Sequence, residues 1–216
     1  MIKTKHSLLS TLLLSLFLLL SGTSSADTQP YGDTGFFVAG VPTNEFVDFA
    51  APETAGRQKM ENWCWAACVQ MVLNYHGLYV KQQDVVSRIF GDTVDRPANG
   101  EQILSALSGW APDARGRRSA IQARVHNQPQ DHASIIRDLD KKWPLIVGLA
   151  GARGAATGHA YVLTAAYFSQ DHFGNPIIRK VVLRDPFPGY ESRTELDADE
   201  FWQRLQFITS VYVERL

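Results

Sequence analysis

The sequence has little cysteine, and this excludes a scaffold built from disulfide bonds. Among its 216 residues there are two cysteines, Cys64 and Cys68. On a helix, side chains four residues apart have Cβ atoms ~5–6 Å apart, farther than the ~3.5–4.5 Å that a disulfide requires. The sequence therefore predicts two free thiols. In an exported protein, a free thiol that persists in an oxidising compartment favours a chemical role for at least one of them.

The sequence also lacks a basic excess and a phosphate-binding glycine motif. Residues 1–26 hold two lysines and no acidic residue, so the other residues carry 19 basic and 22 acidic side chains, a formal net charge of −3. This balance gives no reason to expect nucleic acid or an anionic membrane as a partner. The glycine-rich stretch from Gly148 to Gly158 matches neither GxxxxGKS/T nor GxGxxG. It predicts a mobile loop that leads into His159.

Histidines with the spacing of metal ligands are absent too. The histidines other than His159 that follow residue 26 show no paired spacing typical of zinc, so neither a metal nor an organic cofactor is expected. No repeat, low-complexity tract or linker divides the chain, and residues 27–216 are enough for one domain with its own core. Nothing in the sequence indicates an oligomeric state.

The longest apolar run is too short to span a membrane. It covers Leu8–Leu20, 13 residues, whereas a span needs ~20. Lys3 and Lys5 precede the run, and the small residues Ser24-Ser25-Ala26 follow it, a pattern typical of a secretory signal peptide. The sequence therefore predicts a signal peptide over 1–26 and a periplasmic or secreted product without a stable membrane span. A retained anchor is the alternative.

The hydrophobic pattern predicts helices first and antiparallel strands afterwards, which favours an α+β fold of two packed lobes. The helical lobe contains a central helix over residues 62–76. The expected helices are 62–76, 82–90, 101–107, 131–143 and 196–205. The expected strands are 36–39, 45–49, 144–149, 160–167, 177–183 and 207–213. The sheet lobe is formed by the strands of the second half.

Cys64 falls in the first turn of the central helix, where unpaired backbone N–H groups and the helix dipole favour an anion. This position lowers the pKa of a thiol, and a neighbouring imidazolium lowers it further. The competing interpretation is an inert buried cysteine, which is what we expect of Cys68 one turn deeper.

Three other residues favour a chemical role for Cys64. Gln58 lies six residues upstream, where its amide could join the Cys64 backbone N–H in binding an oxyanion. His159 begins an apolar strand, so its imidazole can face a cleft. Asp185 ends the strand expected to pair with the His159 strand, where it can accept a hydrogen bond from the imidazole. Each has a simpler alternative: a surface Gln, a structural His, an Asx turn before proline.

Together these residues resemble the papain-like cysteine peptidase superfamily. The matching motifs are Gln58-x5-Cys64-Trp-Ala, Gly158-His159-Ala-Tyr-Val and Asp185-Pro-Phe-Pro-Gly. The spacing is similar to that of compact bacterial branches, such as bacteriocin-processing peptidases and secreted effector peptidases. Papain itself has Asn where this chain has Asp185. The resemblance implies the two-lobed papain-like fold and hydrolysis of a protein or peptide substrate without metal or organic cofactor.

The resemblance also implies roles for the four residues. Cys64 would attack a carbonyl, His159 would transfer protons, Asp185 would orient His159, and Gln58 would help to bind the oxyanion. Two alternatives remain at this stage. One uses the same residues for a different acyl transfer, as in a transglutaminase or an amidase of cell-wall peptides. The other is a binding module of papain-like fold that lacks turnover.

Overall fold

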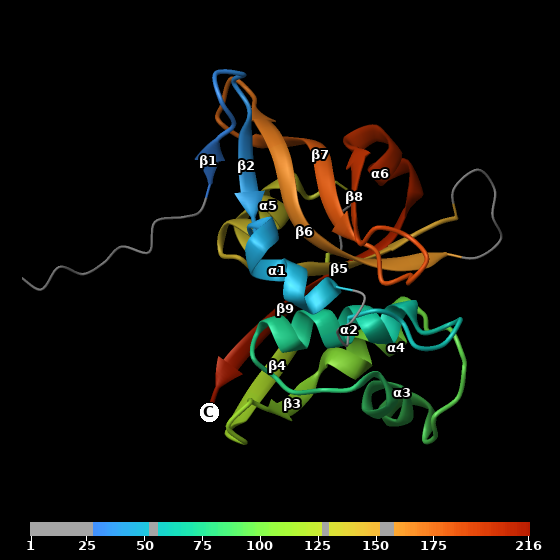
Figure 1. The fold of residues 1–216 in the computed structure, drawn as a ribbon. Coiled ribbons are helices and arrows are strands. Elements are labelled where there is room, and N and C mark those ends of the chain that lie inside the picture. Colours follow the sequence, from blue (N-terminus) through green and yellow to red (C-terminus); the bar gives the residue numbers. More distant parts are fainter. Residues whose placement is uncertain (1–27, 52–55, 127–129, 152–157) are drawn as a thin grey trace, which may run out of the picture.

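The fold was analysed in a computed structural model, which describes residues 28–51, 56–126, 130–151 and 158–216. The predicted signal peptide and residues 152–157 of the predicted glycine-rich loop lie outside the described residues. Two halves are stacked in Figure 1, with most helices in one half and most strands in the other. Within the described residues, no helix combines the length and the apolar character needed to cross a bilayer.

The helical half is organised around α2 (Cys64–Tyr75). Nine of its 12 residues are buried, because the helix is apolar around most of its circumference and is enclosed by other elements. These neighbours are α1 (Thr43–Ala50), α3 (Gln82–Phe90) and α4 (Gly100–Leu107). Helix α3 ends at Gly91, whose φ of 78° suits glycine. Helix α4 begins with a capping box of Asn99 and Gln102.

The strands that the structure describes form one antiparallel sheet with the order β1-β2-β6-β5-β9-β4-β3, and β7 and β8 continue from β6. The strands are β1 (Gln29–Pro30), β2 (Phe37–Gly40), β3 (Gly109–Pro112), β4 (Arg118–Val125), β5 (Leu145–Leu149), β6 (His159–Gln170), β7 (Pro176–Arg184), β8 (Arg193–Asp197) and β9 (Leu205–Arg215). Helices α5 (His132–Asp140) and α6 (Ala198–Arg204) belong to the sheet half.

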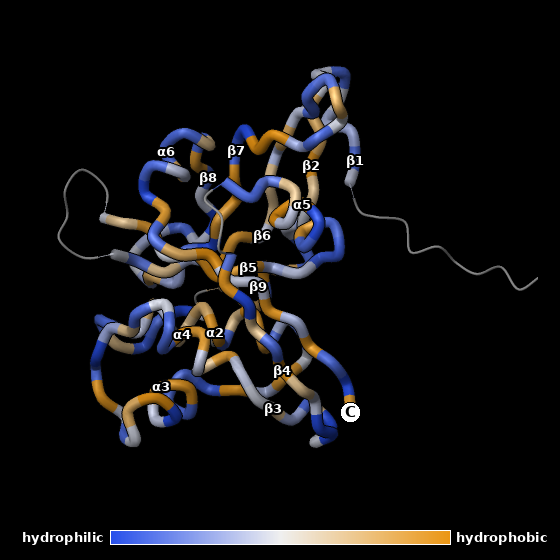
Figure 2. The backbone as a smooth tube through the Cα atoms, turned by 180° about the vertical axis from the view of Figure 1, so that it is seen from behind, coloured by the Kyte–Doolittle hydropathy of each residue, from blue (hydrophilic) through white to orange (hydrophobic). Residues whose placement is uncertain are grey.

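The sheet separates two hydrophobic cores, and β5 contributes to both. Ile146 belongs to the core around α2, whereas Leu145, Val147 and Leu149 belong to the core that contains α5 and α6. Successive residues of a strand point to opposite faces. A strand with a core on each face therefore needs a continuous apolar run, and this is why the sequence identifies β5 by its length and not by alternation. Figure 2 shows hydrophobic residues, in orange, where these elements meet.

The prediction of a strand over 45–49 was wrong, because the chain forms α1 there. Phe46 and Ala50, four residues apart, are buried, and the rings of Phe46 and Phe49 lie 5.3 and 5.6 Å from that of Tyr75. Phe46 and Phe49 are three residues apart, the spacing of one helix face, but the segment 45–49 is too short for this period to stand out against its β-forming residues. Packing against α2 selects the helical spacing.

Four strands, β1, β3, β4 and β8, were not predicted. Strands β3 and β4 follow α4 and extend the sheet into the half that was expected to be helical. Strand β8 occupies the residues before α6, so the predicted helix 196–205 begins only at Ala198. Strands β4 and β8 carry many polar residues, and their apolar positions are too few to stand out. Strands β1 and β3 have only 2 and 4 residues, and each contains a proline. The other predicted helices and strands agree with the structure within a few residues at their ends.

The hairpin of β6 and β7 brings two distant residues together. The strands pair from Gln170 opposite Pro176 to Val162 opposite Arg184, with two irregularities in the register. The turn at Asp171 closes the hairpin. His159, at the start of β6, therefore lies at the same end of the hairpin as Asp185, which follows β7. This was the arrangement expected from their separation in sequence.

Candidate active site

Cys64 is the first residue of α2, and no side chain caps this end of the helix. Burial alone raises the pKa of the Cys64 thiol. The opposing effects are larger: the hydrogen bond and charge of His159, and backbone N–H groups of Ala160 and Trp65, together lower that pKa below its ordinary value. The free N–H groups of the helix end thus stabilise the thiolate instead of pairing with a capping side chain. Cys64 is partly exposed.

His159 lies between Cys64 and Asp185. Its Nε2 atom is 2.8 Å from Oδ1 of Asp185. Because an ionised carboxylate only accepts hydrogen bonds, Nε2 carries the proton of this bond, and Nδ1 is left for Cys64. Burial alone lowers the pKa of His159, but the hydrogen bonds and charges of Asp185 and Cys64 raise it to about 9. The lowered pKa of Cys64 and the raised pKa of His159 both favour the thiolate–imidazolium pair over the neutral pair.

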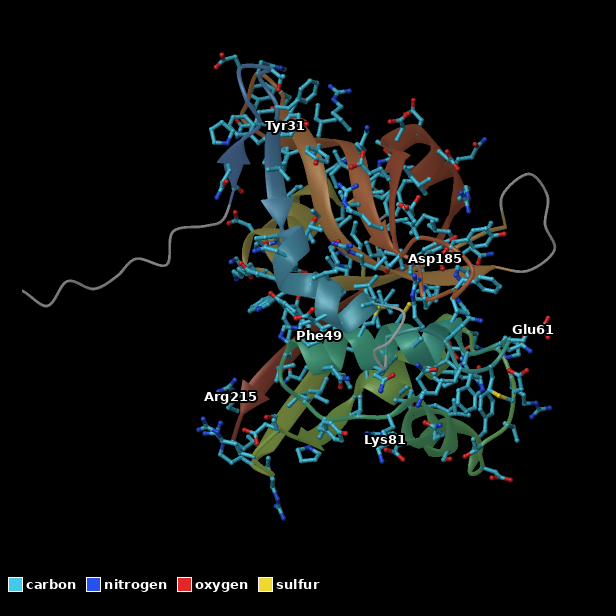
Figure 3. All side chains as sticks on the ribbon, viewed as in Figure 1. Tyr31, Phe49, Glu61, Lys81, Asp185 and Arg215 are labelled. Carbon is cyan, nitrogen blue, oxygen red and sulfur yellow. The ribbon has the colours of Figure 1, made fainter. Side chains whose placement is uncertain are left out.

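Asp185 is fixed by its backbone as well as by its side chain. Its N–H donates to the carbonyl of Ser192 at 2.6 Å, and its Oδ1 accepts a second hydrogen bond, from the N–H of Phe187 at 2.8 Å. The carboxylate is therefore held in place before any substrate binds. In Figure 3, Asp185 lies where the sheet half meets α2.

Gln58 lines the same cleft, but its amide does not point a free N–H into it. Nε2 donates to the carbonyls of Met60 and Glu61, at 3.1 and 2.8 Å. Its buried Oε1 has no hydrogen-bond partner among the described residues. The structure thus brings Gln58 to the expected place, in the loop that enters α2, but both N–H groups of its amide donate to backbone carbonyls of that loop.

Cys68 lies one turn beyond Cys64 and is fully buried. Burial, and to a lesser degree the charges of Cys64 and Asp185, raise the pKa of its thiol well above the ordinary value. Both cysteines are free thiols, as predicted, and the two differ sharply in environment. Among the described residues, no group of three or more His, Cys, Asp or Glu side chains is placed to hold a metal ion.

The cleft has a volume of about 560 Å³ and opens between the two halves. Its sheet wall is shaped by Gly148 and Phe207. A Cβ atom added at Gly148 would lie 2.1 Å from Cε1 of Phe207, so only glycine lets this ring lie against β5. Trp65, Ile103 and Phe187 are other hydrophobic lining residues. The sequence did not single out Phe207 or Ile103, because an apolar residue in a strand or helix ordinarily belongs to the core.

The sequence profile of the Peptidase_C39 like family matches residues 51–210. This range includes Gln58, Cys64, His159 and Asp185. No curated protein sequence matches the chain.

Three solved structures are similar to this chain. The peptidase domain of Streptococcus ComA, a bi-functional ABC transporter involved in a quorum-sensing pathway, is 14% identical, with 74% of this chain and 96% of that chain covered and a TM-score of 0.50. A double glycine motif protease from an AMS/PCAT transporter, in complex with the leader peptide, is 16% identical, with coverages of 74% and 89% and a TM-score of 0.45. The Salmonella effector SpvD is 10% identical, with coverages of 81% and 83% and a TM-score of 0.34. The likeness to the first supports the expected papain-like α+β fold and says nothing of activity.

Proposed function

The chain belongs to the Peptidase_C39 like family, and we propose that it is a cysteine peptidase that hydrolyses peptide bonds with Cys64 as nucleophile. This family membership, with the likeness in fold, establishes the papain-like superfamily and the α+β fold that the three sequence motifs led us to expect. The catalytic roles of the individual residues belong to the proposal.

The observation that carries the proposal is the chain of contacts from Cys64 through His159 to Asp185. The three residues come from a helix, a strand and a loop; Cys64 and His159 line the cleft, and Asp185 contacts His159. The pKa of the thiol is lowered and that of the imidazole is raised to about 9. These opposite directions are what a nucleophile and its proton-transfer partner require.

In the proposed reaction, the Cys64 thiolate attacks the carbonyl carbon of a peptide bond and forms a tetrahedral oxyanion. The intermediate collapses as the C–N bond breaks, and the His159 imidazolium gives its proton to the departing amine. The acyl group remains on Cys64 as a thioester. Water then attacks the thioester and gives a proton to His159. The acid leaves, and the thiolate–imidazolium pair is restored.

The oxyanion would be bound by the backbone N–H of Cys64 and by the Gln58 amide. The Cys64 N–H is the first of α2 and has no partner within the helix. For Gln58 to contribute, one N–H of Nε2 has to turn from the carbonyl of Met60 or Glu61 towards the substrate. The substrate oxyanion, which is charged, is the stronger acceptor.

A cleavage profile tests the proposal. Protein comprising residues 27–216 is incubated with a complex peptide mixture, and new termini are identified by mass spectrometry, with Cys64→Ala as the matched control. We expect new carboxyl and amino termini only with the Cys64 protein. Cross-linked or amine-substituted products without new termini would contradict the proposal and favour a transglutaminase. Release of ammonia or an amine from cell-wall peptides alone would favour an amidase. The absence of any product would favour an inactive binding module.

Limited alkylation identifies the reactive thiol independently of any substrate. Iodoacetamide should modify Cys64 first and should do so well below pH 8, because its pKa is lowered, whereas Cys68 is buried and its pKa is raised. Mass spectrometry of the peptides reads the result. Faster labelling of Cys68 would remove Cys64 as the nucleophile.

We further propose that the protein is exported and that cleavage after Ala26 leaves Asp27 as the first residue. The support is the lysine-flanked apolar run and the small residues after it. N-terminal sequencing of protein recovered from a secreting bacterial host tests this. Recovery of a full-length form confined to the cytosol would contradict it.

A further inference from the structure

Arg57 connects the loop that leads to α2 with the loop that follows β7. It precedes Gln58 in the loop that leads to α2, and only 7% of its surface is exposed. Its Nη1 donates to the carbonyls of Asp185 and Phe187, at 2.7 and 2.9 Å. Its Nη2 donates to the carbonyl of Tyr190 at 2.7 Å. One guanidinium thus binds three backbone carbonyls of the loop that carries Asp185.

The Arg57 side of this bridge is itself fixed. The fully buried Gln82 donates through Nε2 to the carbonyl of Arg57 at 2.7 Å and accepts from the N–H of Lys59 at 3.0 Å. Between these two residues, the N–H of Gln58 donates to the carbonyl of Pro186 at 2.9 Å. The loop before the nucleophile and the loop after β7 are therefore held together as one unit.

The chemistry of the bridge requires arginine. Among the described residues, no carboxylate forms an ion pair with Arg57 at 4.0 Å or less, so backbone carbonyl dipoles are its acceptors. A planar guanidinium presents several N–H groups in a fixed fork, and this lets it bind three carbonyls at once. Lysine is a point charge on a flexible stem and cannot reproduce that geometry.

From this geometry, we propose that Arg57 is a positioning residue that holds Asp185 at hydrogen-bonding distance from His159. The backbone N–H of Asp185 is held by Ser192 and its carbonyl by Arg57. Without Arg57, the carbonyl side is free and the carboxylate can move away from Nε2. A displacement of about 1 Å in such a constellation can lower a rate about 100-fold. The inference rests on the proposed function for its effect on turnover, but not for its effect on the thiol.

Arg184 provides a matched control. It is also buried, with 3% of its surface exposed, and it immediately precedes Asp185 in sequence. In the described part of the chain, however, its Nε and Nη2 atoms have no hydrogen-bond partner. It therefore shares the burial and charge of Arg57 but not its contacts with the 185–190 loop. A residue in this state should be replaceable by methionine without effect on the site.

The experiment compares Arg57→Met, Arg57→Lys and Arg184→Met with the wild type. Two quantities are measured: kcat and KM on a cleaved peptide, and the rate of Cys64 alkylation as a function of pH. For Arg57→Met we expect kcat to fall about 100-fold with little change in KM. We also expect the pH at which Cys64 becomes reactive to rise, because His159 loses the carboxylate that keeps it protonated. Arg57→Lys should lie between Arg57→Met and the wild type, and Arg184→Met should match the wild type in both quantities.

A folded Arg57→Met protein with wild-type kcat and a wild-type alkylation profile would overturn the proposal. If Arg57→Met does not fold, Arg57→Lys decides: an unchanged profile and kcat overturn it, and a displaced profile supports it. An equal displacement in Arg184→Met would also overturn it, since burial of a cation would then be the cause. The alkylation profile does not require turnover. A wild type that cleaves no peptide, with a displaced profile in Arg57→Met, would therefore refute the peptidase and leave the positioning role intact.

Discussion

His159 and His126 each contact a cysteine or serine side chain and lie near a carboxylate, yet the pKa values of the two imidazoles are shifted in opposite directions. His159 contacts Cys64 and Asp185, and its pKa is raised to about 9. His126 follows β4, and its Nε2 is 2.7 Å from Oγ of Ser210 on β9. Burial lowers the pKa of His126, although nearby carboxylates oppose this. Each histidine thus has a nucleophile-type side chain and a carboxylate nearby. The environment of His159 favours the charged imidazolium, whereas that of His126 favours the neutral imidazole.

The direction of the hydrogen bonds explains the difference. The hydroxyl of Ser210 donates to Oδ2 of Asp138, so Nε2 of His126 has to be the donor towards Ser210. In the neutral form, which the lowered pKa of His126 favours, the other nitrogen, Nδ1, is without a proton; it lies 3.6 Å from Asp131. In a nucleophile–base pair the hydroxyl gives its proton to the imidazole. Here that proton faces a carboxylate, so His126 cannot activate Ser210.

Access separates the two clusters as well. Ser210 is fully buried in the middle of the sheet, whereas Cys64 lies in the cleft at the uncapped end of a helix. A helix end supplies free N–H groups for an anion. A central strand has its N–H groups occupied by the neighbouring strands. A nucleophile, a histidine and a carboxylate in contact therefore do not by themselves form a reactive site. Access and free donors are also required.

Replacement of the two nucleophile-type residues should give the largest contrast. Cys64→Ala should lower kcat by about 10⁴-fold or more, because no thioester can form. Ser210→Ala should leave kcat unchanged, since its hydroxyl is bonded to Asp138 inside the sheet. Initial rates on a cleaved peptide measure both, with circular dichroism as a check of folding. A folded Ser210→Ala protein as inactive as Cys64→Ala would mean that the two clusters are coupled.

The carboxylates should show the next largest contrast. Asp185→Ala should lower kcat about 10³–10⁴-fold, because His159 loses the acceptor that fixes its orientation and its proton. Asp185→Asn should retain more activity, because an amide oxygen still accepts from Nε2. Asp138→Asn is the matched change in the other cluster and should leave kcat unaltered. Wild-type kcat for Asp185→Ala would exclude Asp185 from the mechanism.

Replacement of Gln58 should have a smaller effect on kcat. The sequence predicts an oxyanion donor, whereas in the structure its amide donates to Met60 and Glu61. We expect Gln58→Ala to lower kcat about 10²–10³-fold with KM unchanged and the fold intact, as loss of one oxyanion donor does. A lower stability with unchanged kcat would instead show that its bonds to Met60 and Glu61 are its whole role. Thermal unfolding measured beside the kinetics separates these results.

The sequence predicted the positions of the site residues better than their contacts. The apolar pattern of α2 placed Cys64 in the first turn of the helix, and the hairpin length placed Asp185 beside His159, because both depend on regular local geometry. The direction of the Gln58 amide depends on loop carbonyls at Met60 and Glu61, which no pattern encodes. Arg57 was not noticed for the same reason: its acceptors are backbone carbonyls 128 to 133 residues away.

The fold shows the same division. Helix α2 and strand β5 were predicted because each is apolar over a long stretch and buried on most sides. Helix α1 was mistaken for a strand, because the helical spacing of Phe46, Phe49 and Ala50 covers little more than one turn and becomes plain only where α1 packs against α2. Strands β4 and β8 are polar on one face and were not predicted, since their partners β9 and β7 supply the hydrogen bonds that define them.

The smallest expected effect concerns stability and tests the two histidines directly. The folded-state pKa of His126 is lowered below the ordinary 6.5. Its contribution to stability is therefore present above about pH 6.5 and is lost as the pH falls through the folded pKa, because the unfolded chain binds the proton more readily. For each unit by which the pKa is lowered, about 1.4 kcal/mol of the free energy of unfolding is at stake.

His159 should oppose that acid loss. Its pKa is raised to about 9 in the folded protein, so below pH 6 it is protonated in both the folded and the unfolded states. Its own contribution is complete below about pH 6.5 and is lost as the pH rises through 9. Urea unfolding at pH 7.5 and 5 should therefore show a smaller acid loss for His126→Asn than for the wild type, and a larger acid loss for His159→Asn, because that variant lacks the stability that His159 adds as the pH falls. Subtraction against the wild type removes the contribution of His76, whose pKa is about 4 and which titrates in the same direction. Equal acid losses in the wild type and His126→Asn would show that His126 is protonated in the folded protein, and the neutral imidazole on which the contrast with His159 depends would be wrong.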